Sequence, residues 1–164
     1  MEITQEKAHE LFECKDGVLH WKNRAPNLLH YGTIAGHLDN CGYMRTKIKG
    51  KFYLNHRLIF LMHHGYFPEI VDHIDGNKIN NKIENLRKAT KSENCLNKKV
   101  RIDSCLKIKN VRWYKSSKKW AVAITINKKR KHIGYFKDLE LAELVAQEAT
   151  NKFYGEFKYQ GVLL

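Results

Sequence analysis

The sequence has no run of about 18 apolar residues, which is the length that a membrane-spanning helix needs. Its first residues do not combine a basic start with an apolar stretch, so we expect no signal peptide and a cytoplasmic protein. Internal repeats and low-complexity tracts are also missing. The 164 residues, 43% of them hydrophobic, are enough for one ordinary domain or two small ones.

Cysteine is scarce and widely spaced. No two cysteines form the close pair that supplies ligands to a structural zinc ion; they are Cys14, Cys41, Cys95 and Cys105. We therefore expect no structural zinc. In a reducing compartment all four should be reduced thiols.

Acidic residues are nearly absent from one segment. Residues 98–137 contain 14 of the 30 basic residues but only one of the 17 acidic residues, Asp103. The rest of the chain is balanced, so this segment carries the whole net charge of +13. Such a concentration of positive charge indicates a polyanionic partner. Its pattern is that of strands rather than of a basic amphipathic helix, which favours nucleic acid over a membrane surface or a face that serves solubility alone.

Hydrophobic periodicity predicts an α+β protein. We expect helices over 4–14, over 56–64 with Asn55 as N-cap, from Thr90 onward, and after an N-cap at Asp138 to about residue 154. We expect a hairpin over 43–54 with its turn at Lys49-Gly50, and strands leading to His73 and over 86–89, 110–115, 119–126 and 130–136. These elements suggest a first domain over 1–97, in which residues 1–54 are strand-rich and residues 55–97 form the core. A basic linker over 98–109 and a second domain over 110–164 follow.

The dipeptide Asp72-His73 is the strongest candidate for a reactive site. Cleavage of a phosphodiester requires an activated water, neutralised phosphate oxygens and a stabilised leaving alkoxide. A neutral imidazole can take the proton of the water, and one divalent cation on oxygen ligands can serve the other two needs. Adjacent side chains of a strand point to opposite faces, so Asp72 can hold the cation while His73 activates the water.

Asparagines at later positions could complete this site. The helix after Thr90 would bring Asn94 to the cation as a second ligand, and Asn85 could hold either the His73 ring or the connecting loop. His56 could contact phosphate from a helix start, but a structural role is favoured. The remaining polar residues of the loop are expected to satisfy its backbone rather than to bind metal: Asp75, Asn77, Asn80 and Asn81.

This order of residues resembles the HNH endonucleases, and in particular their phage-type, homing-like and free-standing members. The resemblance covers about 50–97 and rests on His56-Arg57-Leu58, Gly65, Pro68, Val71 to Asn77, Asn80-Asn81, Glu84 to Arg87, Thr90, Asn94 and Asn97. It implies a ββα-metal core, with His73 as general base, Asn85 orienting it, and Asp72 and Asn94 as ligands of Mg²⁺ or Mn²⁺. Asn94 stands where many members have histidine, which favours a hard cation. A phage origin would place the protein in the cytoplasm of a host cell.

The basic segment is predicted to form a small three-stranded antiparallel sheet with one packed helix. Val122 and Ile124 should face the helix with Trp120 and Ile126, whereas the small residues between them should face outward: Ala121, Ala123 and Thr125. With Gly134-Tyr135-Phe136 before the helix, this module resembles the AP2 DNA-binding domain, whose sheet lies in the major groove. The resemblance implies DNA contacts, for which we predict Arg112, Tyr114, Lys115, Lys118, Lys119, Thr125, Lys128, Lys129, Arg130 and His132. Because the outward positions of the middle strand are small, phosphate contact is expected to outweigh base readout.

The sequence therefore predicts a metal-dependent endonuclease that hydrolyses double-stranded DNA, with an HNH module that cuts and an AP2-like module that binds. One active centre per chain predicts nicking by a monomer, with a dimer required to cut both strands. The alternatives are a non-cleaving, sequence-specific DNA-binding regulator, and a nuclease or binder directed at RNA. A regulator needs none of Asp72, His73 and Asn94, which favours the nuclease.

Overall fold

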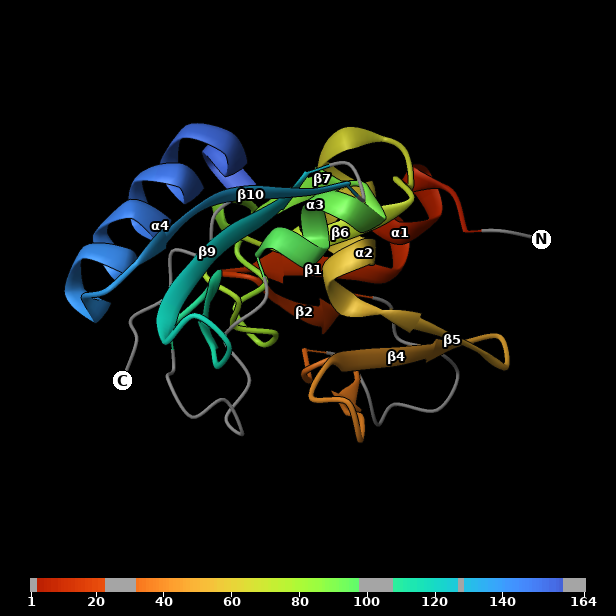
Figure 1. Cartoon of the computed structure of the whole chain (residues 1–164). Helices are drawn as coiled ribbons and strands as arrows, with labels where there is room; N and C mark the ends of the chain where they lie inside the picture. The colour runs from red at the N-terminus through yellow and green to blue at the C-terminus, as the bar shows by residue number, and fades with distance from the viewer. Residues whose placement is uncertain (1–2, 23–31, 98–107, 127–128, 158–164) are drawn as a thin grey trace. The chain divides into compact units, whose positions relative to one another are not determined.

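The computed structural model describes residues 3–22, 32–97, 108–126 and 129–157 (Figure 1). Contacts divide the chain into a first unit, Met1–Thr90, and a second unit, Lys91–Leu164. Most of the predicted linker, 98–107, lies outside the described residues. In the described part of the chain, no helix combines the length and apolarity that crossing a bilayer requires.

The first unit begins with a short helix followed by a hairpin. Helix α1 (Gln5–Leu11) is capped by Thr4 and passes directly into β1 (Phe12–Lys15), which pairs antiparallel with β2 (Val18–Trp21). The prediction of a helix through residue 14 is therefore wrong at its C-terminal end. Along β1, buried Phe12 is followed by exposed Glu13, and this two-residue alternation is that of a strand.

A three-stranded antiparallel sheet, in the order β3-β4-β5, leads into the central helix. Its strands are β3 (His37–Leu38), β4 (Met44–Ile48) and β5 (Lys51–Leu54). Lys49 and Gly50 have positive φ angles of 46° and 83° and make the predicted turn.

Helix α2 (Asn55–His64) follows β5 without a gap and ends at Gly65, which has the predicted left-handed conformation. Asn55 is not the N-cap, contrary to the prediction. Its buried amide instead joins neighbouring segments: Oδ1 accepts from Thr46 Oγ1 at 2.7 Å, and Nδ2 donates to the Ala35 carbonyl at 2.8 Å. These long-range bonds fix the start of α2 against β4.

Two further strands complete the first unit. Strands β6 (Ile70–His73) and β7 (Leu86–Ala89) pair antiparallel and are joined by a loop and a 3-10 helix, η1 (Ile83–Asn85). Leu58 and Ile59 of α2 are fully buried in one core cluster with Val71 and Leu86. The strand pair is thereby anchored to the helix that begins beside the active-site candidates.

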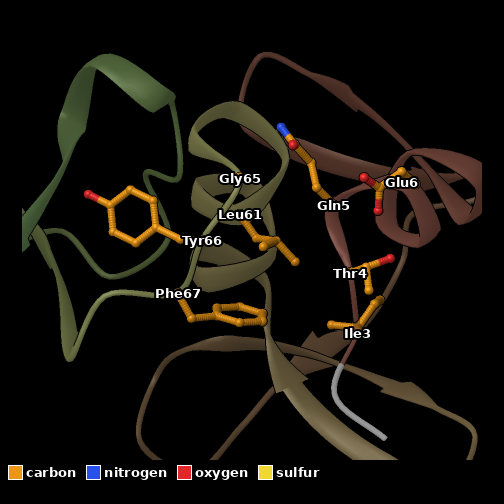
Figure 2. A pocket seen from close by; sticks show the side chains of 8 residues that line it. All are labelled: Ile3, Thr4, Gln5, Glu6, Leu61, Gly65, Tyr66 and Phe67. Atoms are coloured by element: carbon orange, nitrogen blue, oxygen red, sulfur yellow. The ribbon is translucent and has the colours of Figure 1, made fainter.

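The two helices of the first unit meet where α1 begins and α2 ends. Gln5 Nε2 donates to the Met62 carbonyl at 2.8 Å. A pocket of about 350 Å³ lies beside this junction. Figure 2 shows its lining side chains, which include Gln5 and Phe67. Among the described residues that line it, Glu6 alone carries a charge, and neither Asp72 nor His73 lines it.

The second unit contains the predicted sheet and helix. Its elements are α3 (Lys91–Leu96), β8 (Val111–Tyr114), β9 (Lys119–Ile126), β10 (Lys129–Phe136), α4 (Leu139–Tyr154) and η2 (Gly155–Phe157). The sheet is antiparallel in the order β10-β9-β8, and Val122 and Ile124 are fully buried under α4, as predicted. Asp138 caps α4 as predicted, since its Oδ1 accepts from the Leu141 amide at 2.9 Å.

Two outward positions of β9 are covered. Ala121 and Ala123 face away from α4 as predicted, but they are only 7% and 8% exposed. The strand register places Ala121 between Arg112 and Tyr135, and Ala123 beside His132. These larger neighbours cover the two methyl groups, so the outer face presents the flanking side chains instead.

Candidate active site

Asp72 and His73 lie at the end of β6 and are both buried, with 6% and 5% of their surface exposed. The register sets Asp72 opposite Arg87 and His73 opposite Leu86 on β7. Because neighbouring residues of a strand point to opposite faces, the carboxylate and the imidazole serve two different sides of one strand end.

Arg87 compensates the charge of the buried Asp72 carboxylate. Its Nε and Nη2 atoms both donate to Asp72 Oδ2, at 3.0 Å and 2.9 Å. A buried carboxylate without such a partner would be costly, because desolvation of a charge exceeds the energy of most single contacts. Arg87 belongs to the motif singled out in the sequence, but nothing in the sequence assigned it to Asp72.

Asn81 holds the His73 ring. The Asn81 Oδ1 atom lies 2.9 Å from His73 Nε2, and both residues are buried. An amide oxygen can only accept, so Nε2 carries the hydrogen and the lone pair of the neutral ring lies on Nδ1. The sequence predicts Asn81 to be a loop-satisfying residue, and this prediction is wrong.

Asn85, to which the resemblance gave the task of orienting His73, bonds within the loop. Its Nδ2 donates to Asp75 Oδ1 at 2.9 Å and to the Asn80 carbonyl at 2.8 Å, and its Oδ1 accepts from the Asp75 amide at 3.1 Å. Its backbone carbonyl accepts from Ile74, the residue after His73, at 2.9 Å. Asn85 therefore closes the loop, which is the other of the two roles expected for it.

Asp75 is the centre of this loop network. Besides Asn85, it accepts from Asn80 Nδ2 at 2.8 Å and from the Asn77 amide at 2.8 Å. Partial burial alone would raise the pKa of Asp75, but these hydrogen bonds outweigh it and lower the pKa below its usual value. The predicted loop role of Asp75, Asn77 and Asn80 is confirmed.

Two aromatic rings pack near His73. The His56 ring lies 4.9 Å from it in an edge-on arrangement, and the Tyr43 ring lies 6.1 Å from His73 and 5.3 Å from His56. His56 is 4% exposed and packs against the His73 ring, which agrees with the structural role favoured for it. No signal in the sequence pointed to Tyr43, which reaches the site only through the turn before β4.

Burial keeps both rings uncharged. It lowers the pKa of His56 to about 3, with repulsion from His73 and Arg57 as smaller causes. It also raises the pKa of Tyr43, with the negative charges of Asp72 and Asp39 adding to the effect. At neutral pH the surroundings of His73 therefore include a neutral imidazole and a neutral phenol.

Asn94, the second predicted ligand, lies half-buried on α3 in the second unit. Its union with Asp72 at one cation remains a prediction. Within the described ranges, no three His, Cys, Asp and Glu side chains gather into a metal-binding group. A site of one carboxylate and one amide oxygen is of a different kind, and such hard donors suit Mg²⁺ or Mn²⁺.

The predicted DNA-contacting residues lie around the outer face of the second unit's sheet. The register places Arg112, Tyr114, Thr125, Arg130 and His132 on the face opposite α4, all of them exposed. The lysines flank this face at strand ends and turns: Lys115, Lys118 and Lys129 are exposed, Lys119 is half-buried, and Lys128 lies outside the described residues.

Tyr135 joins this face although it is not among the DNA-contacting residues predicted from the sequence. Its ring lies 5.5 Å from Tyr114 and 4.4 Å from His132, and it is 48% exposed. The face therefore combines two arginines with a group of three aromatic rings. Strand alternation from Ala121 could have identified Tyr135, had the register of β10 been known.

Comparisons with known proteins bear on the first unit most directly. Residues 53–96 match the model of the family described as HNH endonuclease. The chain is also similar to Protein 3.8 of Escherichia phage T7, with 32% identity over 95 residues that cover 57% of this chain and 74% of that protein. No solved structure matches the chain. The family match ends before β8, and these matches do not support the AP2-like interpretation of the sheet.

Proposed function

The chain belongs to the HNH endonuclease family, and from this premise we propose that it hydrolyses phosphodiester bonds of double-stranded DNA, one strand at a time. The observation that carries the proposal is the buried pair Asp72-His73 with Asn81 on the imidazole. A base and a hard ligand, side by side on one strand end, are what metal-assisted hydrolysis of a phosphodiester requires.

His73 acts as the general base in this proposal. With Nε2–H donated to Asn81, the Nδ1 lone pair accepts a proton from the water that attacks phosphorus. The uncharged rings of His56 and Tyr43 limit the positions that the imidazole can take. Asn85 acts indirectly, because its bonds to Asp75 and Ile74 hold the loop that follows His73.

Asp72 and Asn94 are the proposed ligands of the divalent cation. The cation would supply positive charge to the phosphate oxygens and to the leaving alkoxide. Arg87 would support Asp72 as a metal ligand, because its two hydrogen bonds to one carboxylate oxygen orient the carboxylate. Cleavage between the 3′ oxygen and phosphorus would leave a 5′-phosphate and a 3′-hydroxyl.

The outer face of the second unit is the proposed DNA-binding surface, in an AP2-like arrangement. Its exposed arginines and lysines suit phosphate contacts. A protein with this surface alone would serve as a non-cleaving regulator. The Asp72, His73 and Asn81 arrangement favours the nuclease over that alternative.

A plasmid-nicking assay tests the proposal. Supercoiled plasmid should become open-circular with wild-type protein and Mg²⁺ or Mn²⁺, and EDTA should abolish the reaction. His73→Ala should lower the rate by about 10²–10⁴-fold. Asn77→Ala is the matched control, because Asn77 is an exposed loop residue whose side chain accepts from the nearby Ile79 amide. Unchanged nicking by His73→Ala would refute the proposal.

A further inference from the structure

A second, larger pocket of the first unit lies between α1, the end of β2 and the β4–β5 hairpin. Its volume is about 650 Å³, within the range of small-molecule sites. Apolar and aromatic side chains form much of its lining: Ile3, Leu11, Trp21, Ile48 and Tyr53. Neither Asp72 nor His73 lines it, so it is distinct from the candidate active site.

Four lysines line the same pocket, Lys7, Lys47, Lys49 and Lys51. The last three belong to the β4–β5 hairpin, which contains no acidic residue between Met44 and Leu54. Lys7 is paired with Glu10, whereas in the described part of the chain no carboxylate pairs with the three hairpin lysines. Their positive charge is therefore uncompensated within these ranges and is available to an anion.

An apolar, aromatic lining with cationic groups at its edge matches the chemistry of a nucleotide. A nucleobase can stack on aromatic rings such as Trp21 and Tyr53, both half-buried, while lysine ammonium groups bind the phosphates on either side. Lys51 Nζ lies 5.4 Å over the Tyr53 ring, so a positive charge and an aromatic face are next to each other in the pocket. A base within a duplex is stacked and paired, so only an unpaired base can enter such a pocket.

Strand β4 connects this pocket to the active-site candidates. Tyr43, which precedes β4, packs on the His56 and His73 rings, whereas Ile48 at the other end of β4 lines the pocket. The five intervening steps of strand span about 17 Å. At about 3.4 Å of rise per nucleotide, this corresponds to about five nucleotides of DNA.

We propose that the lysine-edged pocket binds one unpaired nucleotide of the DNA substrate, about five nucleotides from the bond that is cut. The substrate would then be DNA with an overhang, flap or bulge near the cleavage position. This inference rests on the proposed function for the identity of its ligand. It concerns binding, however, and is tested separately from cleavage.

The test uses full-length His73→Ala protein and two labelled duplexes of equal length, one blunt and one with a 3′ overhang of four thymidines. Fluorescence anisotropy should show about tenfold tighter binding to the overhang duplex, because one base gains an aromatic stacking partner. Lys49→Gln/Lys51→Gln, added to this protein, should reduce the preference, because the phosphates beside the stacked base lose their ammonium partners. It should also reduce the slope of log K against log salt by about 1.4, for two lost contacts to a single strand.

The matched control is Lys137→Gln/Lys152→Gln in the same background. Both of these lysines are exposed and lie in the second unit. Their substitution removes two positive charges, as the substitution of Lys49 and Lys51 does. This control should keep the full preference for the overhang. Equal binding of the blunt and overhang duplexes to His73→Ala would overturn the proposal, and so would a preference that Lys49→Gln/Lys51→Gln leaves unchanged.

Competition with thymidine monophosphate and with tetrathymidylate distinguishes two sources of the same ligand chemistry. Displacement by tetrathymidylate alone supports a strand of DNA as the occupant. Equal displacement by the mononucleotide would assign the pocket to free nucleotides and overturn the assignment to substrate DNA. If wild-type protein nicks no DNA but still prefers the overhang duplex, the proposed nuclease function is wrong. The proposal that the pocket binds an unpaired nucleotide is then still supported.

Discussion

The imidazole of His73 contacts the Asn81 amide and packs against two neutral rings. Asn81 Oδ1 fixes Nε2 at 2.9 Å, and His56 packs edge-on at 4.9 Å. An amide oxygen can only accept a hydrogen bond, so it selects one tautomer of the ring. The reactivity of His73 should therefore depend on orientation, and single side chains around it should matter.

Asn81→Ala should reduce nicking by about 10–100-fold, in the range found when a residue that orients a reactive group is removed. The ring would lose the acceptor that selects its tautomer. Nicking rates at several pH values, together with thermal melting, measure the effect. Asn81→Asp should restore orientation and shift the pH profile toward higher pH, because a carboxylate favours the protonated ring. A nicking rate equal to wild type for Asn81→Ala would exclude a positioning role.

His56 should make stability depend on pH. Its pKa is lowered from 6.5 in the unfolded chain to about 3 in the folded protein, mainly by burial. Between these values the unfolded chain binds the extra proton, so stability falls as pH decreases below about 6.5. From pH 7.5 to pH 5 this group should remove about 2 kcal/mol from the free energy of unfolding.

Urea denaturation at the two pH values measures this dependence. His56→Phe keeps a ring at the position but cannot take a proton. Between the two pH values, its free energy of unfolding should therefore fall by about 2 kcal/mol less than that of wild type. The same pH dependence in both proteins would show that His56 is not its source.

At the scale of elements, the β1–β2 turn supports the loop that carries Asn81. Gly17 in this turn has a φ of 79°, and a Cβ atom there would lie 2.5 Å from Lys82 N and 2.7 Å from Asn81 C. Both contacts are with backbone, so the loop would have to move. The turn is thus a support for the His73 partner, although it lies far from it in sequence.

Gly17→Ala should therefore lower nicking more than its loss of stability explains. The left-handed conformation costs about 1–2 kcal/mol for alanine, and the clash displaces the Asn81 backbone as well. Gly32→Ala is the matched control, because Gly32 has a φ of 75° and no atom within 4 Å of the added Cβ. Nicking and urea denaturation of both variants separate the two effects. Equal nicking by the two variants at equal stability would contradict the supporting role of the turn.

At the scale of the whole molecule, α3 bears on both proposed activities, DNA cleavage and DNA binding. It carries Asn94, the proposed ligand, while its Leu96 packs on the second unit's cluster of Ile124, Ala149 and Tyr154. Lys109 Nζ also donates to the Leu96 carbonyl at 3.1 Å. Removal of the sheet would thus remove the packing partners of the helix that carries a ligand. Point substitutions on the outer face test DNA binding more cleanly than truncation does.

Arg112→Gln/Arg130→Gln should weaken binding to blunt duplex DNA and reduce the slope of log K against log salt by about 1.8, for two lost phosphate contacts. Both arginines are exposed on the face opposite α4, so folding should be unaffected. Anisotropy across a salt series measures the slope, and nicking at saturating DNA should remain near wild type. Lys137→Gln/Lys152→Gln should leave the slope nearly unchanged, and an equal change in both variants would point to net charge instead of a defined surface.

Sequence alone decides the features that depend on near neighbours. The turn at Lys49-Gly50, the cap at Asp138 and the placement of Asp72-His73 on one strand end each follow from a few adjacent residues. Strand and helix periods likewise identify Val122 as a core position. In these cases local backbone preference and the apolar pattern act in the same direction.

Only the tertiary structure decides which distant groups meet. Asn80, Asn81 and Asn85 are chemically equal in the sequence, yet the path of the loop brings Asn81 to His73 and leaves Asn85 with Asp75. That path runs against the β1–β2 turn at Gly17, which lies far from the loop along the chain. The Asp72–Arg87 pair, the covered alanines of β9 and the lysine-edged pocket have the same origin, because each depends on strand register or on packing between segments that no local pattern encodes.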